Sequence, residues 1–191
     1  MAPATYQIIS FTSAAEWETW LDANHARVDG VWLRMFRKDS GKPTVTYAEA
    51  LDAALCYGWI DGLRKSHDAE SFIQKFTPRR PRSLWSKVNT GHVERLHQAG
   101  KMKPAGVAAV EAAKKDGRWQ AAYDSPGKAA VPPDFLRALA RNKKAKAFFA
   151  TLNKTNLYSI TWRLQTARKP ETRLRRIYAI IEMLAAGKKF H

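Results

Sequence analysis

The 191 residues are enough for one domain, or for one domain with a small helical addition, and for a sizeable buried core. The net charge of +16, from 33 basic and 17 acidic side chains, favours a negatively charged partner, unless it belongs to a solvated surface without a ligand. The single cysteine excludes an internal disulfide. We expect a cytoplasmic protein, because neither a signal peptide nor an apolar run of ~20 residues is recognisable.

The first elements along the chain are a strand, a helix and a second strand. Residues 6–10 favour a short strand, and Ser13 followed by Glu16 is a capping-box pattern that predicts a helix over 14–26. Residues 31–38 alternate as a strand does and carry apolar side chains on both faces, which predicts a central position in a sheet.

A second capping box, formed by Thr46 and Glu49, starts the most informative stretch of the chain. The helix that it predicts should end at Gly58, because glycine adopts the left-handed C-cap conformation without steric cost. Residues 59–65 then read as a strand. Asp61 next to a glycine is unfavourable there, so a hydrogen bond, a bulge or a site should compensate.

A hairpin and two helices follow. A turn over 67–70 leads into a return strand over 71–77. Ser83 is placed to cap the next helix, and Pro104 suits the first position of another that ends near Lys115.

These elements predict three segments. We expect an α+β domain over 1–116, with a small, mostly antiparallel sheet packed with helices, and a Pro/Gly linker over 117–133 that Trp119 and Tyr123 pin to this domain. The remainder, 134–191, reads as all helix and holds 14 basic and 3 acidic side chains. Its helices are expected at 134–140, 144–152, 155–168 and 170–187.

Four segments carry a resemblance to a known family. CYGWIDG, FTPRRPRSLWSKVN and GKMKPAG, in that order, and the closing TARKPETRLRRIYAIIEMLAAGKK resemble the bacterial YdeI/OmpD-associated, or bacteriocin-protection, proteins from about Phe11 to Lys189. The resemblance implies a stress-response role in tolerance of bacteriocins or cationic antimicrobial peptides, with an indirect link to an outer-membrane porin. It supplies no established catalytic residues to transfer to positions of this sequence.

The basic stretch after the hairpin is the best candidate for anion binding. Two prolines stiffen its arginines just before the expected helix start, where free N–H groups and the helix dipole favour anions. The alternative is a basic loop paired with local acidic residues such as Asp61 or Glu70. The candidate residues are Arg79, Arg80, Arg82, Ser83, Ser86 and Lys87.

A pocket around Asp61 is the second candidate. Its carboxylate is either an acid or acceptor at the mouth of a pocket, with Arg64 or Arg79 as partner, or a structural group bonded to backbone N–H groups or to an arginine. The lone cysteine is either an activated nucleophile or, as is commoner late in an apolar helix, a small buried hydrophobe. The pocket candidates are Cys56, Trp59, Asp61, Arg64 and Trp85.

The start of the last helix is the third candidate. Arg168, Arg173 and Arg176 either contact phosphate or form the solvated back of an amphipathic helix. The histidines are too scattered to suggest a metal site, and no nucleotide-binding or hydrolase motif occurs, so we expect neither metal nor cofactor.

Three functions remain open. The leading expectation is a non-enzymatic cytoplasmic protein whose role in peptide tolerance is indirect, through an acidic partner or porin expression, because a chain of net charge +16 repels cationic peptides. The first alternative is a nucleic-acid-binding module that uses the loop 79–87 and the C-terminal helices. The second is an uncharacterised enzyme with a pocket around Asp61.

Overall fold

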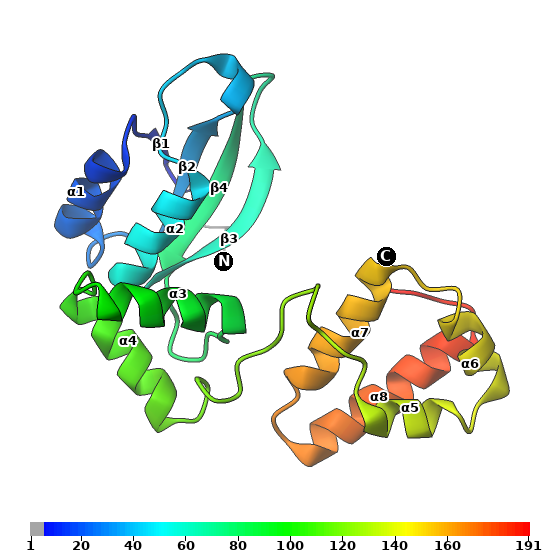
Figure 1. The fold of residues 1–191 in the computed structure, drawn as a ribbon. Helices are drawn as coiled ribbons and strands as arrows, with labels where there is room; N and C mark the ends of the chain where they lie inside the picture. The colour runs from blue at the N-terminus through cyan, green and yellow to red at the C-terminus, as the bar shows by residue number, and fades with distance from the viewer. Residues whose placement is uncertain (1–5) are drawn as a thin grey trace. The chain divides into compact units, whose positions relative to one another are not determined.

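The computed structural model of the chain describes residues 6–191, which form two compact units (Figure 1). Unit 1 consists of the residues up to Ser83 together with Asn89–Gln120. Unit 2 consists of Leu84–Val88 and Ala121–His191. The second crossing from unit 1 to unit 2, after Gln120, lies inside the stretch that the prolines and glycines mark as a linker.

Unit 1 is built on a four-stranded sheet with the strand order β1-β2-β4-β3. β1 is parallel to β2, and the β2–β4 and β4–β3 pairs are antiparallel, so the expected small, mostly antiparallel sheet is confirmed. β2 has a neighbour on each side, as its two apolar faces predicted. The strands are β1 (Ile8–Ser10), β2 (Val31–Phe36), β3 (Trp59–Ser66) and β4 (Ser71–Pro78).

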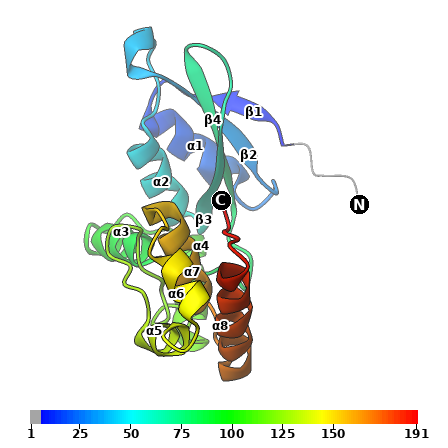
Figure 2. The ribbon, with the colours of Figure 1, turned by 90° about the vertical axis from the view of Figure 1, so that its right-hand side faces the viewer.

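Two helices of unit 1, α1 (Ala14–Asn24) and α2 (Tyr47–Cys56), lie on the same face of this sheet (Figures 1 and 2). A short 3-10 helix, η1 (Lys38–Ser40), lies between β2 and α2. The capping box that starts α2 is complete: the Thr46 hydroxyl accepts from the backbone N–H of Glu49, and the Glu49 carboxylate accepts from the N–H of Thr46.

At α1 only half of the expected capping box forms. Ser13 accepts from the backbone N–H of Glu16, but the Glu16 carboxylate binds the N–H and the hydroxyl of Thr12 instead of returning to Ser13. The cap therefore includes one residue more than the sequence pattern indicated.

Aromatic side chains join the helices to the sheet in the core of unit 1. Trp17 of α1 is fully buried, and its ring lies 5.7 Å from Phe76 of β4 and 6.5 Å from Trp59 of β3, measured between centroids. Its indole N–H donates to the carbonyl of Ala50 in α2 at 3.1 Å. A buried polar atom thus has a partner, and one side chain ties three elements together.

The expectation that Ser83 caps the following helix is wrong. α3 (Lys87–Gln98) begins four residues later, and Ser83 instead closes a turn, in which its hydroxyl accepts from the backbone N–H of Arg80 at 3.0 Å. Serine makes the same kind of local hydrogen bond in turns as at helix starts, so its presence alone does not distinguish the two.

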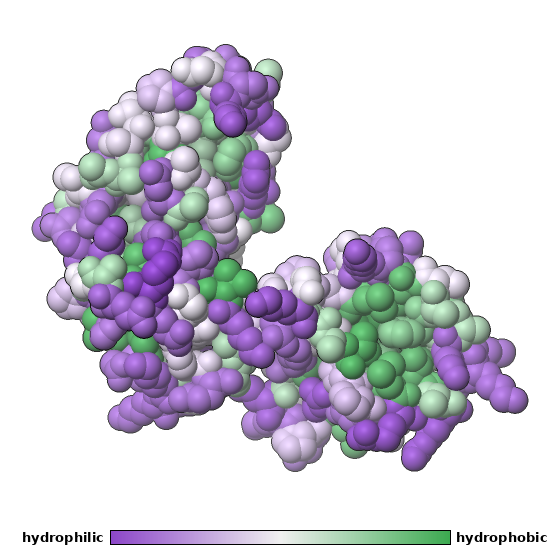
Figure 3. All heavy atoms as spheres, in the orientation of Figure 1, coloured by the Kyte–Doolittle hydropathy of each residue, from purple (hydrophilic) through white to green (hydrophobic). Residues whose placement is uncertain are grey.

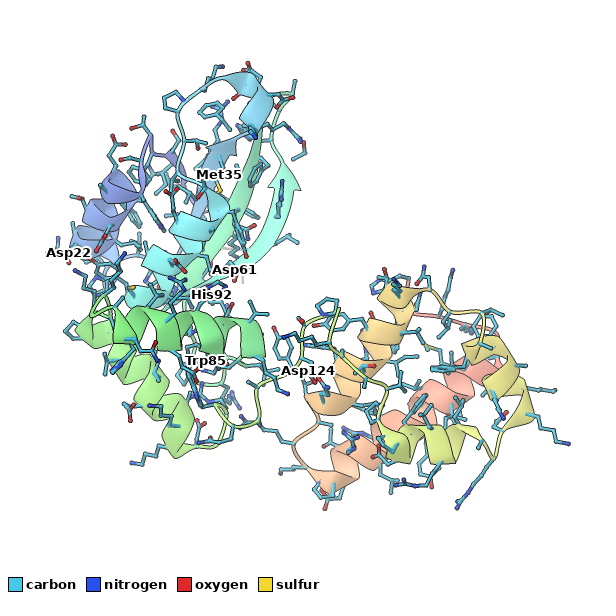
Figure 4. The ribbon with its side chains drawn as sticks, viewed as in Figure 1. Asp22, Met35, Asp61, Trp85, His92 and Asp124 are labelled. Atoms are coloured by element: carbon cyan, nitrogen blue, oxygen red, sulfur yellow. The ribbon has the colours of Figure 1, made fainter. Side chains whose placement is uncertain are left out.

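α3, from Asn89 onward, and α4 (Pro104–Lys115) complete the helices of unit 1, and α4 begins at the expected proline. Arg95 of α3 donates to both carboxylate oxygens of Asp52 in α2, at 2.7 and 2.8 Å, near His92 (Figure 4). α4 approaches the end of α2 so closely that the backbone N–H of Lys103, just before α4, donates to the carbonyl of Cys56.

Unit 2 is helical, as expected for the C-terminal part of the chain. Its helices are α5 (Pro133–Leu139), α6 (Lys143–Phe149), α7 (Lys154–Gln165) and α8 (Pro170–Ala185). They enclose a core that includes Phe135, Ile160, Leu164, Ile177, Ile180 and Leu184. Partly buried hydrophobic residues surround this core, and hydrophobic side chains gather on the face of unit 2 turned to the viewer in Figure 3.

Candidate functional site

The face of the sheet opposite α1 and α2 carries a row of aromatic and basic side chains. Along β2, Val31, Leu33 and Met35 are buried, so the alternating residues, Trp32, Arg34 and Phe36, point to the other face and stay partly exposed. We call this the outer face. The two faces differ only because successive side chains of a strand point to opposite sides of the sheet.

The strand register adds residues of β4 and β3 to the outer face. Residues directly opposite one another in antiparallel strands share a face. Trp32 pairs with Lys75 of β4. Arg34 pairs with Ile73 of β4, which in turn pairs with Lys65 of β3, so both lysines join the row. Charge from three strands is therefore collected on one surface.

Each aromatic ring of the outer face lies beside a cation. The Lys65 ammonium is 5.1 Å from the centroid of Trp32, and the Arg34 guanidinium carbon is 4.7 Å from that of Phe36. Before β1, the ring of Tyr6 lies 4.1 Å from the Lys75 ammonium. Such contacts hold positive charge directly above flat apolar surface.

The turn between β3 and β4 neutralises part of this charge. Asp68 binds Arg34 at 2.7 Å. Glu70 binds Lys42, whose ammonium lies 5.3 Å from the centroid of Phe36, at 2.5 Å. A hydrogen bond from Ser71, with help from Arg34, lowers the pKa of Asp68, so this carboxylate stays charged. Among the residues that the structure describes, Lys65 and Lys75 form no ion pair, and the outer face keeps a net positive charge.

These residues are not among the site candidates that the sequence indicated. The alternation over 31–38, with apolar side chains on both faces, predicted only a central strand. The available signal was Arg34, which shares one face of the strand with Trp32 and Phe36. A sheet face that is buried under another layer rarely carries a charged side chain, so the arginine indicated an exposed face.

The six anion-binding candidates do not belong to one unit. Arg79, Arg80, Arg82 and Ser83 lie in unit 1 after β4, whereas Ser86 and Lys87 lie in unit 2. Lys87 forms an ion pair with Asp124 at 2.8 Å, which is the main reason that the pKa of Asp124 is lowered (Figure 4).

Asp61 is compensated in two of the ways expected of it. A bulge interrupts the β3–β4 register between Asp61 and Arg64, and the hydroxyl of Tyr47 in α2 donates to the Asp61 carboxylate at 2.8 Å (Figure 4). Burial, and then this hydrogen bond, raise the pKa of Tyr47 above its usual range. A side-chain hydroxyl thus serves as a hydrogen-bond partner of the carboxylate, as a structural role requires.

The other pocket candidates have separate surroundings. The Arg64 guanidinium lies 3.7 Å from the centre of the Phe72 ring, the indole N–H of Trp59 donates to the carbonyl of His25, and Trp85 belongs to unit 2.

The environment of Cys56 opposes nucleophilic chemistry. The thiol is buried, and its desolvation raises the pKa to about 11, so at neutral pH it is almost entirely protonated.

Two of the three basic-helix candidates are engaged within unit 2. Arg173 donates to both carboxylate oxygens of Asp134, at 2.7 and 2.8 Å, and this pair lowers the pKa of Asp134. Arg176 donates to the carbonyl of Arg163 near the end of α7, whereas Arg168 is exposed.

Within residues 6–191, no group of three or more histidine, cysteine, aspartate or glutamate side chains is arranged to hold a metal ion.

The fold and the outer face define an α+β protein with a basic, aromatic sheet surface and a helical second unit. Residues 9–109 match the family described as "Domain of unknown function (DUF8412)", and since this match covers more than half of the sequence, the chain belongs to that family. Residues 128–187 match "Bacteriocin-protection, YdeI or OmpD-Associated", which confirms the resemblance for the C-terminal part.

The two matches divide the motifs that carried the resemblance. CYGWIDG, FTPRRPRSLWSKVN and GKMKPAG lie within 9–109, in the family of unknown function, and all but the last two residues of the closing segment lie within the bacteriocin-protection match. No curated protein and no solved structure matches the chain. Of the helices described, none combines the length and the apolar character that crossing a membrane requires.

Proposed function

We propose that this protein is a non-enzymatic, cytoplasmic binding protein whose ligand is single-stranded nucleic acid, held on the outer face of the sheet. One observation carries the proposal: three aromatic rings, those of Tyr6, Trp32 and Phe36, each lie within about 5 Å of a lysine or arginine cation on a partly exposed sheet surface.

The chemistry of this surface suits a single strand better than a duplex. Unstacked bases can lie on aromatic rings, and phosphates between them can bind lysine and arginine, a combination that works for many base sequences. A duplex hides the faces of its bases, and its major groove admits a helix or a two-stranded ribbon and not the face of a sheet. The net charge of +16 also speeds the approach of any polyanion.

The test is the salt dependence of binding to a labelled 12-nucleotide poly-U strand, followed by fluorescence anisotropy with the full chain. The variant Lys65→Ala/Lys75→Ala removes two charges from the outer face. The matched control, Lys115→Ala/Lys144→Ala, removes two exposed lysines elsewhere and leaves the same net charge.

If both outer-face lysines contact phosphates, the slope of log K against log salt falls in magnitude by about 1.4, or about 0.7 per lost contact. Trp32→Ala should weaken binding by the stacking energy of one base, about 1–3 kcal/mol, with little change in slope. Equal losses in the two double variants would mean that overall charge alone drives binding, and the outer face would be excluded as the site.

Tolerance of bacteriocins or cationic antimicrobial peptides is the second candidate function, favoured by the family match of residues 128–187. We propose that the effect is indirect, through nucleic acid or an acidic partner and, further on, porin expression, because direct capture of a cation by so basic a chain is opposed at long range. A host lacking the gene is complemented with the wild type, the outer-face variant and the control variant, and survival under peptide is measured.

Rescue by the wild type and the control but not by the outer-face variant would support this link. Equal rescue by all three would separate tolerance from nucleic-acid binding, and no rescue by the wild type would remove the tolerance role.

A further inference from the structure

Unit 2 contains an open hollow between α7 and α8 that none of the proposals above uses. Its volume is about 440 Å³, within the range of small-molecule sites. The wall is mostly apolar, and two arginines enter it. The lining side chains include Trp162 and Arg163 of α7, Arg176, Ile180 and Met183 of α8, and Phe190 beyond α8.

The two arginines are held in place without being neutralised. Arg176 donates to the carbonyl of Arg163 and to the hydroxyl of Thr166, and Arg163 donates to the carbonyl of Ser159. Within the described part of the chain, neither guanidinium forms an ion pair with a carboxylate. Two guanidinium groups therefore stand beside an apolar surface without a carboxylate partner among the described residues.

Hydrogen bonds also fix the position of Phe190, which forms part of the wall of the hollow. Asn156, which is 1 % exposed, accepts from the backbone N–H groups of Phe190 and His191 at 3.1 Å and donates to the carbonyl of His191 at 3.2 Å. The Phe190 ring lies 3.8 Å from the Arg163 guanidinium carbon. A buried amide thus sets the position of an aromatic ring at the rim, which makes the hollow a preorganised site.

We propose that this hollow binds a free carboxylic acid with an unbranched apolar tail. Guanidinium groups fixed on two helices suit a carboxylate head, and the apolar wall gains from covering a hydrocarbon chain. At about 30 Å³ per group, the hollow has room for about 15 non-hydrogen atoms, which matches a medium-chain acid such as decanoate. A cationic amphiphile would meet two positive charges there.

The test is titration calorimetry of the full chain with decanoate, at concentrations below micelle formation, and with decyltrimethylammonium as the cationic counterpart. Saturable binding of one decanoate per chain is expected, with much weaker binding of the cation. Octanoate should bind about fifteenfold more weakly than decanoate, since each methylene contributes about fourfold.

Three variants locate the site. Arg176→Gln removes one charge but keeps a donor for the Arg163 carbonyl, and it should weaken decanoate binding about tenfold or more. Arg175→Gln is the matched control, because Arg175 is exposed on the same helix and does not line the hollow. Ala179→Trp introduces a large side chain at an exposed lining position and should abolish binding without disturbing the core.

Several results would overturn the proposal: equal binding of acid and cation, equal losses in the two glutamine variants, or unchanged binding in Ala179→Trp. Ala179→Trp changes an exposed residue, so it decides the question even if Arg176→Gln unfolds.

A final arm of the experiment measures binding of the protein to vesicles of anionic phosphatidylglycerol. Vesicle binding that Ala179→Trp removes, without binding of free decanoate, would assign the hollow to a membrane surface and refute a soluble ligand.

Discussion

Gly106 in α4 is the position where one added methyl group should cost most. A Cβ atom built there would lie 2.1 Å from the carbonyl oxygen of Cys56 and 2.9 Å from that of Leu55, both at the end of α2. The closest comfortable carbon–oxygen contact is about 3.3 Å, so α4 and α2 would have to separate by roughly 1.2 Å. Both clashing atoms belong to the backbone and cannot turn aside as a side chain would.

We therefore expect Gly106→Ala to destabilise unit 1. Overpacking of this kind costs about 1–3 kcal/mol or more, and it outweighs the 0.5–1 kcal/mol that alanine normally gains over glycine inside a helix. Gly91→Ala is the matched control. Gly91 lies inside α3 with no atom within 4 Å of its added Cβ, so this variant should stabilise the protein by about 0.5–1 kcal/mol.

The assay is thermal unfolding followed by tryptophan fluorescence, which reports mainly on unit 1. Five of the seven tryptophans lie there: Trp17, Trp20, Trp32, Trp59 and Trp119. The midpoint should fall by roughly 5–10 °C in Gly106→Ala and rise by a few degrees in Gly91→Ala. If the two variants shift the midpoint in the same direction, the close contact between α4 and the end of α2 is refuted.

Two further predictions concern single ionisable groups. Arg173 lowers the pKa of Asp134, so the pair stabilises the fold above about pH 4, and this contribution disappears as pH falls through the lowered pKa. The partly exposed pair contributes under about 1 kcal/mol, and the unfolding curves of Asp134→Asn and wild type should converge as pH falls below the usual range of an aspartate; a gap that stays constant over that fall would contradict this. Cys56, with its pKa raised to about 11, should react with iodoacetamide far more slowly in the folded protein than in guanidinium, and equal rates would show an accessible thiol.

If the outer face binds nucleic acid, two groups of positive charges act on different steps of binding, the encounter and the bound complex. The excess of lysine and arginine in the C-terminal part would raise the rate of encounter, whereas the few cations beside Trp32 and Phe36 would form the contacts that last. The salt slope measures the second group and the association rate at low salt measures the first. The two lysine-to-alanine double variants, which have equal net charge, separate these quantities.

Local elements were determined by the sequence itself, because their signals act between residues close in the chain. Thr46 and Glu49 specify the start of α2 through a reciprocal pair of hydrogen bonds, and Pro104 suits the first turn of α4 because it lacks the N–H that would be unsatisfied there. Composition likewise determined the basic character of the C-terminal helices. Two local signals were less reliable: Ser83 closes a turn with the hydroxyl that could have capped a helix, and only half of the capping box expected at α1 forms.

Only the tertiary structure decided which surfaces are covered. The alternation in β2 is equally compatible with either face being buried, and the packing of Trp17 on Phe76 selects the face toward α1 and α2. That choice leaves Trp32 on the outer face, and the pairing of β2 with β4 brings Lys75 beside it. These contacts join residues far apart in the chain, and no local pattern specifies them.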